Sequence, residues 1–336
     1  MNGYWDQDSD IVRVTKPVVV FGDHTQVLKL VDFDFVVGAD GVKILKPKDF
    51  LDAAFLKFFL EANPFPSLGY ARHYRHISGL EIPLPPLEEQ RRIVAKLDQA
   101  FTALDRARAH AEANLADAEA LFQTQSGTVF ENLFQTHKST ALSDIAKKIT
   151  KGSSPKWQGI SYVDEPGVLF VTSENVSANS MDFSKTKYVE TAFNEKDKKS
   201  ILKFGDVLTN IVGASIGRTA VYDRHDVANI NQAVCLIRCD EEKLRGAFLA
   251  YLLNSPLFKE MLHAGEVNMA RANLSLTFFR EFKVPLPSLD IQDSTIGKIE
   301  RMRDDTDKLI SAYSSQLTDL ADLRQSLLKR AFSGQL

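Results

Sequence analysis

The feature of this chain that most restricts its fold is a segment that occurs twice, 202 residues apart. The first copy reads EIPLPPLEEQRRIVAKLDQA from Glu81, and the second reads KVPLPSLDIQDSTIGKIERM from Lys283. Aligning Gln90 with Gln292 requires no insertion over the rest of the segment. Because an internal repeat decides the architecture before any single motif does, we expect the chain to use one structural unit twice.

The match continues upstream of the repeated segment. AAFLKFFL from Ala53 aligns with GAFLAYLL from Gly246, and GVKIL from Gly41 aligns with AVCLI from Ala233, each with a small shift. Each copy therefore consists of a globular part followed by a long helix. A chain of 336 residues with 44% apolar residues is long enough for two or three domains, each with its own core.

Each helix is expected to begin directly after a run of prolines. Pro83, Pro85 and Pro86 cannot continue a central strand or a helix interior, so the preceding strand ends there. Glu88 and Glu89 then place negative charge on the first turn of the next helix, where the helix dipole favours it. The second copy repeats this pattern, and the two junctions are predicted to fix how each globular part is attached to its helix.

Both helical segments carry apolar residues spaced alternately three and four apart. The first series begins with Val94, Leu97 and Phe101, and the second begins with Ile296 and Ile299. This spacing is typical of a coiled coil, and at 1.5 Å per residue each helix would be about 60 Å long. We expect the two helices to pack together. The alternative, two separate helices lying on their own domains, is left open.

Composition excludes several classes of protein. No apolar run approaches the roughly 20 residues that cross a membrane, and the acidic N-terminus is unlike a secretory signal, so a cytoplasmic protein is expected. Cys235 and Cys239 lie in an apolar, strand-like stretch and are expected to be reduced thiols. The net charge of -3 argues against coating nucleic acid by charge alone, although residues 140–287 carry a small excess of Lys and Arg.

Several longer phrases carry a resemblance to a known family. They are IPLPPLEEQRRIVAKLD, its second copy and the C-terminal LRQSLLKRAFSGQL, with ITKGSSPK, LFVTSENV, LKFGDVLTNIVGASIGRTAV and NINQAVCLIR between them. The first group resembles the specificity (S) subunit of type I restriction-modification systems, and the second group resembles the parts of one complete target recognition domain. The resemblance covers essentially the whole chain, and the paired proline and helix element is its most specific part.

The resemblance implies an α+β fold, in which globular α/β target recognition domains are joined by two long helices packed as an antiparallel coiled coil. The expected parts are the C-terminal part of a first target recognition domain (1–85), a first long helix (86–137), a second, complete target recognition domain (138–287) and a second long helix (288–336). The implied protein is not an enzyme, and each recognition domain would read one half of a split sequence in double-stranded DNA.

The resemblance also implies partners and cofactors. Methyltransferase (M) subunits would dock on the helices, and restriction (R) subunits would join through them. No cofactor is expected in this chain, because S-adenosylmethionine and ATP with Mg would belong to the partner subunits. The sequence itself contains no GxxxxGK phosphate loop, no GxSxG motif and no histidine spacing suited to a metal. The helices would separate the two domains by a distance that fits half-sites one to two turns of DNA apart.

The first domain departs from the family pattern. Its counterparts of ITKGSSPK and VTSENV are absent, so residues 1–85 are expected to be an N-terminally truncated recognition domain, to be compact in their own way, or to be completed by another chain. With one complete recognition domain, two chains could instead form a homodimer that reads a palindromic split site. A further alternative is a truncated coiled-coil protein that dimerises or regulates without reading DNA specifically.

Candidate DNA contacts in the second domain lie in expected loops, where side chains are free to bind. Arg and Asn form paired hydrogen bonds with guanine and adenine, and Lys binds phosphate. The candidates come from the segments KGSSPKW, VTSEN, GASIGR and MARANLS. They are Lys151, Ser153, Ser154, Lys156, Trp157, Ser173, Glu174, Asn175, Ser215, Arg218, Arg271 and Asn273.

In the first domain the candidates are His73, Tyr74 and Arg75. They combine a donor for a base edge, an aromatic ring and a charge for phosphate. Structural roles are the alternative at single positions. Trp157 would equally cover a core, Glu174 and Asn175 would equally cap a turn, and His73 would equally be a solvated loop residue.

Overall fold

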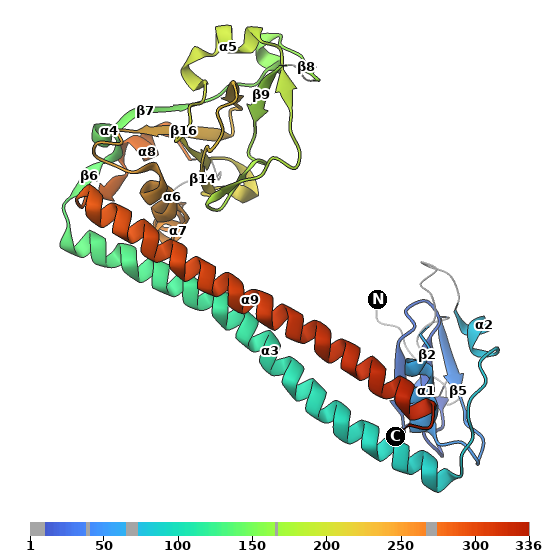
Figure 1. The fold of residues 1–336 in the computed structure, drawn as a ribbon. Helices are drawn as coiled ribbons and strands as arrows, with labels where there is room; N and C mark the ends of the chain where they lie inside the picture. Colours follow the sequence, from blue (N-terminus) through green and yellow to red (C-terminus); the bar gives the residue numbers. More distant parts are fainter. Residues whose placement is uncertain (1–10, 38–40, 65–72, 165–166, 267–273, 336) are drawn as a thin grey trace. The chain divides into compact units, whose positions relative to one another are not determined.

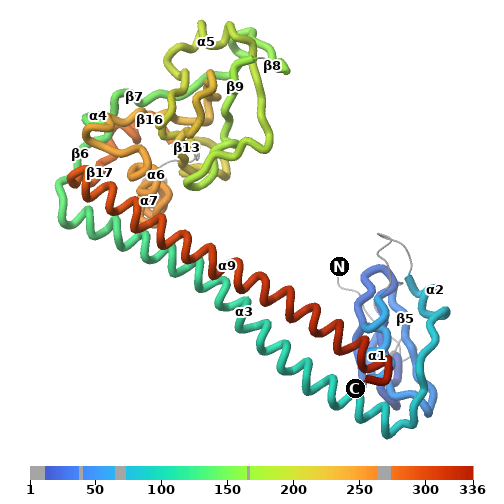
Figure 2. Tube along the Cα trace, in the orientation of Figure 1, coloured from blue at the N-terminus to red at the C-terminus, as the bar shows by residue number. Residues whose placement is uncertain are grey.

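The structure is a computed structural model that describes residues 11–37, 41–64, 73–164, 167–266 and 274–335. The chain forms two compact units (Figures 1 and 2). Unit 1 contains residues 1–115 and 311–336, and unit 2 contains residues 116–310. Two long helices, α3 (Leu87–Thr136) and α9 (Leu289–Phe332), each contribute residues to both units.

Unit 1 is built on a three-stranded antiparallel sheet in the order β3-β2-β5, with a short separate pair β1-β4. Helix α1 packs against strands β2 and β3. The elements are β1 (Ile11–Val12), β2 (Val18–Gly22), β3 (Leu28–Val31), β4 (Phe35–Val36), β5 (Val42–Leu45), α1 (Ala53–Ala62) and α2 (Tyr74–Ile77).

Helix α1 joins the sheet of unit 1 to the long helices. Asp52 caps its N-terminus, because the Asp52 carboxylate accepts the backbone N–H groups of Ala54 and Phe55 at 2.9 and 3.1 Å. The apolar face of α1 then packs against both long helices, with the rings of Phe55 and Phe332 5.0 Å apart. The buried members of this core are Phe55, Phe58, Ala62, Ile93, Leu97, Phe101, Leu328 and Ala331.

Unit 2 contains two four-stranded sheets, in the orders β15-β9-β12-β8 and β14-β13-β16-β7, and two short pairs, β10-β11 and β17-β6. Its helices are α4 (Leu142–Ile145), α5 (Ala192–Lys196), α6 (Gly246–Asn254), α7 (Pro256–Glu266) and α8 (Leu276–Glu281). Its strands are β6 (Ser139–Ala141), β7 (Ala146–Lys151), β8 (Tyr162–Val163), β9 (Val168–Val171), β10 (Val176–Ser177), β11 (Ser180–Met181), β12 (Tyr188–Val189), β13 (Val207–Asn210), β14 (Thr219–Val221), β15 (Ala228–Ile230), β16 (Val234–Cys239) and β17 (Lys283–Pro285).

The larger core of unit 2 lies between the second sheet, helix α6 and the long helices. The rings of Phe130 on α3 and Phe248 on α6 pack edge to face with their centres 5.5 Å apart. Cys235 and Cys239 are free and buried on β16, which confirms the prediction of reduced thiols. Burial raises the pKa of Cys235 to about 12, so this thiol stays protonated and unreactive at neutral pH.

The two units share the substructure that the upstream repeat predicts. β2 and β5 pair antiparallel before α1, with Val19 opposite Leu45, and β13 and β16 pair antiparallel before α6, with Val207 opposite Ile237. β3 and β14 extend the two sheets in the same way. Unit 2 adds β7 beside β16, whereas the described residues of unit 1 hold no strand at the equivalent edge of β5.

The long helices pack antiparallel. In unit 1 the guanidinium of Arg324 on α9 lies over the ring of Phe101 on α3, 3.9 Å from its centre. In unit 2 Arg303 on α9 lies 3.8 Å over the ring of Phe122 on α3. The repeat offset of 202 converts Phe101 into Arg303 and Phe122 into Arg324. The two contacts therefore join the same two positions of the repeat, and each time the ring lies on α3 and the guanidinium on α9.

The predicted antiparallel coiled coil is confirmed by this packing. The helices begin and end within a few residues of the predicted ranges 86–137 and 288–336. The division of the chain into four domains stays a prediction, since the compact units divide each long helix between them. Across the ranges that the structure describes, no helix is both long and apolar enough to cross a membrane.

A buried glutamine attaches the first long helix to unit 1. The side-chain N–H groups of Gln90 donate to the carbonyl oxygens of Phe50 and Pro85 at 2.9 and 2.8 Å. The side-chain oxygen of Gln90 accepts the backbone N–H of Asp52 at 2.8 Å. One fully buried amide thus joins the start of α3 to the chain that leads into α1.

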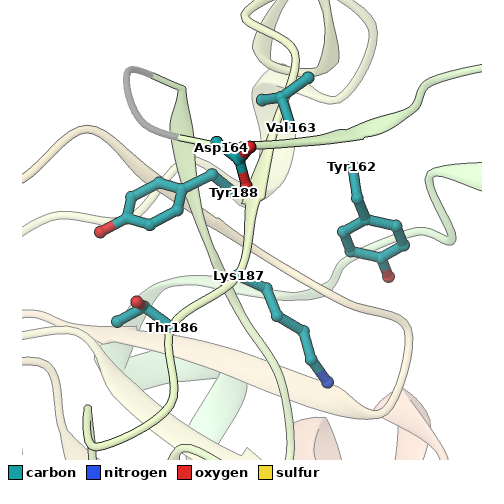
Figure 3. A pocket seen from close by; sticks show the side chains of 6 residues that line it. All are labelled: Tyr162, Val163, Asp164, Thr186, Lys187 and Tyr188. Atoms are coloured by element: carbon teal, nitrogen blue, oxygen red, sulfur yellow. The ribbon is translucent and has the colours of Figure 1, made fainter.

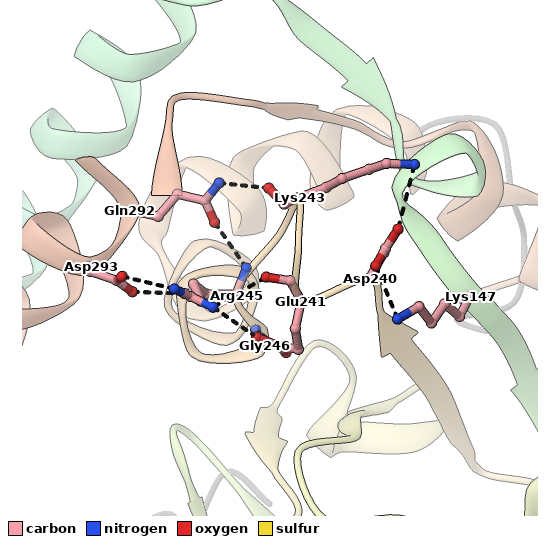
Figure 4. A network of polar contacts seen from close by, with 8 residues as sticks. All are labelled: Lys147, Asp240, Glu241, Lys243, Arg245, Gly246, Gln292 and Asp293. Atoms are coloured by element: carbon pink, nitrogen blue, oxygen red, sulfur yellow. Dashed lines mark hydrogen bonds and ion pairs between the residues drawn. The ribbon is translucent and has the colours of Figure 1, made fainter. Parts of the chain in front are cut away.

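The aligned glutamine makes the same three contacts in unit 2, and Figure 4 shows two of them, those with Lys243 and Arg245. Gln292 donates to the carbonyl oxygens of Lys243 and Pro287 at 2.8 and 3.0 Å, and accepts the backbone N–H of Arg245 at 2.9 Å. Arg245 also forms two hydrogen bonds with the carboxylate of Asp293, at 2.9 and 3.1 Å. The repeated junction therefore has a definite task, which is to fix the orientation of each long helix on the globular part that precedes it.

Candidate nucleic-acid interface

The KGSSPKW segment leaves strand β7 and crosses the end of β15. A Cβ atom at Gly152 would lie 1.8 Å from the carbonyl oxygen of Ile230, so only glycine permits this crossing. Lys151, before the glycine, is exposed, and Ser153 and Ser154, after it, are half-buried. The crossing brings these three candidates to the same end of the sheet as the next loop, which follows β9.

Trp157 projects from a short 3-10 helix, Lys156–Gln158, that ends the same segment. Its side chain is 82% exposed, so the alternative in which Trp157 covers a core is wrong. Lys156 beside it is also exposed. An exposed ring next to a lysine offers both a stacking surface and a charge for phosphate.

The loop after β9 carries Ser173 and Glu174. Ser173 is half-buried and Glu174 is exposed. The carboxylate of Glu174 accepts a hydrogen bond from the ammonium of Lys187 at 2.9 Å, and this hydrogen bond lowers the pKa of Glu174. Glu174 therefore stays charged at neutral pH and partly neutralises a nearby lysine.

Asn175 is buried and supports the same loop from within. Its side-chain oxygen accepts the backbone N–H and the hydroxyl of Thr172 at 2.9 and 3.2 Å. Its two side-chain N–H groups donate to the carbonyl oxygens of Asp182 and Lys185, both at 2.9 Å. The alternative role considered for Asn175, stabilising a turn, is the one that its contacts describe.

The GASIGR segment forms the connection from β13 to β14. The backbone N–H of Asn210 donates to the carbonyl of Arg218, and the N–H of Gly217 donates to the carbonyl of Asn210, both at 2.9 Å. Gly213 and Gly217 have φ values of 80° and 83°, which suit glycine. Arg218 is exposed and Ser215 is half-buried. The loop is thus closed at its base, and its tip faces solvent.

The side chain of Asn210 connects this loop to the loop after β9. Its N–H groups lie within hydrogen-bond distance of the carbonyl oxygens of Ser173 and Val176, at 2.9 and 3.3 Å, and of the hydroxyl of Ser215, at 3.2 Å. Two segments that the sequence analysis selected separately are therefore held together at the end of β13.

The fourth segment, MARANLS, ends at the same place. The backbone N–H of Leu274 donates to the carbonyl of Ile211 at 3.0 Å, and Ile211 follows Asn210 directly. Arg271 and Asn273, the two candidates from this segment, lie outside the described residues. Their predicted contact with DNA stays a prediction, like that of the other candidates.

In unit 1 the candidates lie around Asp23, the residue after β2. His73 is buried, and its backbone N–H and ring Nδ1 lie 3.1 and 2.9 Å from the carbonyl oxygen of Asp23. The backbone N–H of Tyr74 donates to the carboxylate of Asp23 at 2.6 Å. Tyr74 and Arg75 are exposed, and the Lys43 ammonium lies 5.8 Å from the centre of the Tyr74 ring. His73 thus positions the segment, while Tyr74, Arg75 and Lys43 face outward.

The carboxylate of Asp23 is stabilised in its charged form. Burial by itself raises its pKa, but hydrogen bonds from the backbone N–H groups of Tyr74 and His73, with the charge of Lys43, outweigh burial, and the pKa falls below the usual 3.8. The negative charge therefore holds the candidate segment of unit 1 in place at neutral pH.

The candidate segments of the two units occupy equivalent positions. His73 donates to the carbonyl of the residue after β2, and Leu274 donates to the carbonyl of the residue after β13. Since β2 and β13 are equivalent in the two sheets, His73 and Leu274 lie at the same end of the same substructure. This correspondence was not expected from the sequence, where the two segments share little beyond an arginine.

A surface pocket of about 810 Å³ lies elsewhere in unit 2, along β8 and β12 (Figure 3). None of the candidate DNA contacts that the structure describes lines it, although Lys187, which bonds Glu174, does. Within the residues that the structure describes, no group of three or more His, Cys, Asp or Glu side chains is arranged to hold a metal ion. The residues that line the pocket are Tyr162, Val163, Asp164, Thr186, Lys187 and Tyr188.

Sequence reasoning missed Asn210, Lys43 and the need for Gly152. The available signal for Asn210 was its position: it is a polar residue at the end of an apolar strand and inside a phrase already noted for the family. Buried polar groups at such places are usually hydrogen-bonded to something specific. Lys43 lies in a short strand that gives no separate sign of binding.

Comparison with protein families identifies the chain. The family described as the type I restriction modification DNA specificity domain matches residues 136–318, which is more than half of the sequence. This chain belongs to the type I restriction-modification DNA specificity family. The predicted resemblance is confirmed.

Curated relatives carry the same description. The chain is 26% identical over 283 residues to the type I restriction enzyme EcoBI specificity subunit of Escherichia coli, covering 78% of this chain and 60% of that protein. It is 23% identical over 274 residues to the type I restriction enzyme MjaVIII specificity subunit of Methanocaldococcus jannaschii, covering 77% of this chain and 62% of that protein. Both relatives are named specificity subunits, and the chain spans only about 60% of their length.

Two solved structures align with 97% of this chain and have the same fold. The HsdS subunit from Thermoanaerobacter tengcongensis aligns with a TM-score of 0.62 at 23% identity, covering 97% of this chain and 82% of that chain. A chain in a structure concerned with complex assembly and conformational transition of the type I R-M system aligns with a TM-score of 0.77 at 22% identity, covering 97% and 83%. The α+β fold with paired long helices is therefore the fold of this family.

Proposed function

We propose that this chain is the DNA sequence-recognition subunit of a type I restriction-modification complex and reads a bipartite target. The observation that carries the proposal is the meeting of separate candidate loops at the end of β13, matched in unit 1 by the candidate segment at the end of β2. Two equivalent surfaces on one chain suit a target made of two half-sites.

The exposed candidates divide by chemistry. Lys151 and Lys156 would bind phosphates, and Arg218 would reach a guanine edge, where a paired hydrogen bond discriminates by about 1 to 3 kcal/mol. Trp157 would stack or contact a thymine methyl group. In unit 1 the corresponding group is Tyr74, Arg75 and Lys43, while the buried Asn175 and His73 would act through the loops that they support.

The proposed partners follow from family membership. Methyltransferase subunits would dock on α3 and α9, and restriction subunits would join through them. S-adenosylmethionine and ATP with Mg would be bound by those partners, and the complex would work in the cytoplasm, where it meets DNA. The two long helices would set the distance between the half-sites.

Selection from a random pool of DNA duplexes tests the proposal. The purified chain, alone and with a methyltransferase subunit, is incubated with the pool at two stated salt concentrations, because phosphate contacts weaken as salt rises. A split motif with a fixed spacer is the expected result. Failure to enrich any sequence, together with tight self-association, would instead favour the second function, a coiled-coil protein that regulates without reading DNA.

A homodimer is a separate proposal with its own measurement. It rests on the fuller set of candidate loops in unit 2, since two copies of that unit would read a palindromic split site. Light scattering of the protein alone decides it. A dimer at micromolar concentration together with a palindromic motif supports this assembly, and a monomer contradicts it.

A further inference from the structure

Asn210 makes more contacts between candidate loops than any single candidate does. Its side chain is fully buried and donates toward two carbonyl oxygens of one loop, those of Ser173 and Val176, and toward the hydroxyl of Ser215 in another. Because both partner carbonyls belong to the main chain, the contact fixes the path of the first loop and not only one of its side chains.

The main chain of Asn210 holds the second loop at the same time. Its N–H donates to the carbonyl of Arg218, and its carbonyl accepts the N–H of Gly217, both at 2.9 Å. Displacing Asn210 would therefore move Ser173 and Glu174 in one loop together with Ser215 and Arg218 in the other. All four are candidate DNA contacts.

The side-chain oxygen of Asn210 adds a second observation. It is buried, and no hydrogen bond to it is found among the residues that the structure describes. A buried acceptor left unpaired is unfavourable, and such groups in native proteins call for an explanation outside the stability of the fold. A leucine or valine would remove this unpaired acceptor but would leave the carbonyl oxygens of Ser173 and Val176 without their donor, so the asparagine is explained by the loop that it holds.

Among the described residues of the two units, this contact occurs in unit 2 alone. In the paired strands Asn210 faces Val234, and the residue at the matching position of unit 1, Gly22, faces Val42. Gly22 has no side chain, and unit 1 instead holds its candidate segment through Asp23. The two units therefore position their candidate segments by different means.

We infer that Asn210 is a positioning residue that sets the sequence specificity of unit 2 by fixing the loops 173–176 and 211–218 relative to each other. The inference rests on the proposed function. Base readout depends on side-chain placement to well below 1 Å, and supporting contacts of this kind provide it. Asn210 itself is buried and touches no base.

The test compares Asn210→Leu with a matched control in the same strand. Leucine keeps the branching at Cγ and the number of heavy atoms, and it removes the donors. Thr209→Val is the control, because Thr209 is also fully buried and its hydroxyl bonds only that of Thr219, at 2.9 Å, among the residues that the structure describes. Valine removes this contact but leaves the hydrogen bond from the Thr219 hydroxyl to the carbonyl of Gly217 in the second loop. For both full-length variants, melting temperature, backbone hydrogen exchange and selection from the random duplex pool are measured.

For Asn210→Leu, hydrogen exchange is expected to rise in both loops together, and the preference for the unit 2 half-site is expected to fall at least tenfold. The other half-site should be unchanged. Thr209→Val, at a similar loss of melting temperature, should keep both slow exchange and the full motif. Unchanged exchange in Asn210→Leu, or an equal loss of preference in Thr209→Val, would overturn the inference.

The two measurements also separate this inference from the proposed function. If the wild-type protein enriches no motif, the proposed function fails, and with it the assignment of Asn210 to specificity, whatever exchange shows. If the wild type enriches a split motif and Asn210→Leu loosens both loops without changing the motif, only the positioning inference fails.

Discussion

Three buried amides, those of Gln90, Gln292 and Asn210, join segments that are distant in this sequence. An amide suits this task because it offers two donors and one acceptor without carrying a charge into the interior. In each case its donors bond main-chain carbonyl groups. Replacing any of the three would leave buried main-chain groups without partners, and the cost would exceed the loss of the side chain itself.

The first prediction concerns Gln90. Gln90→Leu should lower the free energy of unfolding of unit 1 by about 3 kcal/mol, because two carbonyl groups and one N–H lose their partners in the interior. Denaturant unfolding followed by circular dichroism measures the change. Gln125→Leu, at an exposed position of α3, is the control and should change stability by less than about 0.5 kcal/mol. Equal midpoints for Gln90→Leu and wild type would contradict the prediction.

The second prediction concerns Asp23 and pH. Its pKa is lower in the folded protein than the usual 3.8, so the carboxylate stabilises the fold at pH values above this number, and the contribution disappears as pH falls through the folded pKa. Asp23→Asn keeps the shape and does not titrate. The stability difference between wild type and variant should therefore be largest near neutral pH and shrink below about pH 4.

Thermal unfolding at a series of pH values measures this difference. A difference that stays constant between pH 7 and pH 3 would show that the charge of Asp23 has no part in holding the Tyr74 segment.

At the scale of elements, the antiparallel helices depend on pairs of unlike residues. Phe122 and Arg303 pair in unit 2, and Phe101 and Arg324 pair in unit 1. Arg303 also forms an ion pair with Glu119 at 3.2 Å. A guanidinium over an aromatic ring contributes about 0.5 to 2 kcal/mol, more when water is excluded. The pairs therefore help to set the register of the helices as well as their stability.

The third prediction tests this pairing by exchange. Phe122→Arg should destabilise unit 2 by at least about 2 kcal/mol, because it removes a buried ring and brings two guanidinium groups together. Adding Arg303→Phe to the same protein restores an unlike pair and should recover part of the loss. Thermal unfolding of the two single variants and the double variant completes the cycle. If the destabilisation of the double variant equals or exceeds the sum of the destabilisations of the two single variants, the recovery is absent and the prediction is wrong.

At the scale of the whole molecule, the proposal is that α3 and α9 set the spacing between two reading surfaces. Because the helices are antiparallel, a higher residue number in α3 pairs with a lower one in α9. Inserting the same number of residues into both helices at matched positions therefore keeps the residue pairs on both sides of the insertion. Leu115 and Ile310 are such matched positions.

The fourth prediction uses that property. Inserting one heptad after Leu115 and another after Ile310 lengthens the paired helices by about 10 Å, which equals about three base pairs of DNA. The selected motif should keep both half-sites and gain that many base pairs between them. A heptad inserted in one helix only is the control and should abolish the motif. An unchanged spacer in the double insertion would exclude the helices as the element that measures distance.

Much of this architecture could be predicted from the repeat. The junctions, the long helices and the shared strands before α1 and α6 follow from proline positions and heptad spacing, which act locally. Most of the described candidates in unit 2 lie in connections between strands, as predicted, but Lys151 ends strand β7, and in unit 1 Tyr74 and Arg75 lie on helix α2. The convergence of the unit 2 loops on β13 could not be predicted, because it depends on long-range contacts of Asn210 and on the Gly152 crossing, which leave no periodic signal in the sequence. Burial of Asn175 and His73 was missed for the same reason.

The exchange of Phe and Arg between the two copies also decides whether either long helix could pair with a second copy of itself. If α3 met another α3 in the same antiparallel register, Phe101 would face Phe122, and if α9 met another α9, Arg303 would face Arg324. Two copies of α3 would thus pair without any guanidinium over a ring, and two copies of α9 would place guanidinium groups against each other. The two helices are therefore complementary to each other at these contacts, and each pairs more favourably with the other than with a second copy of itself.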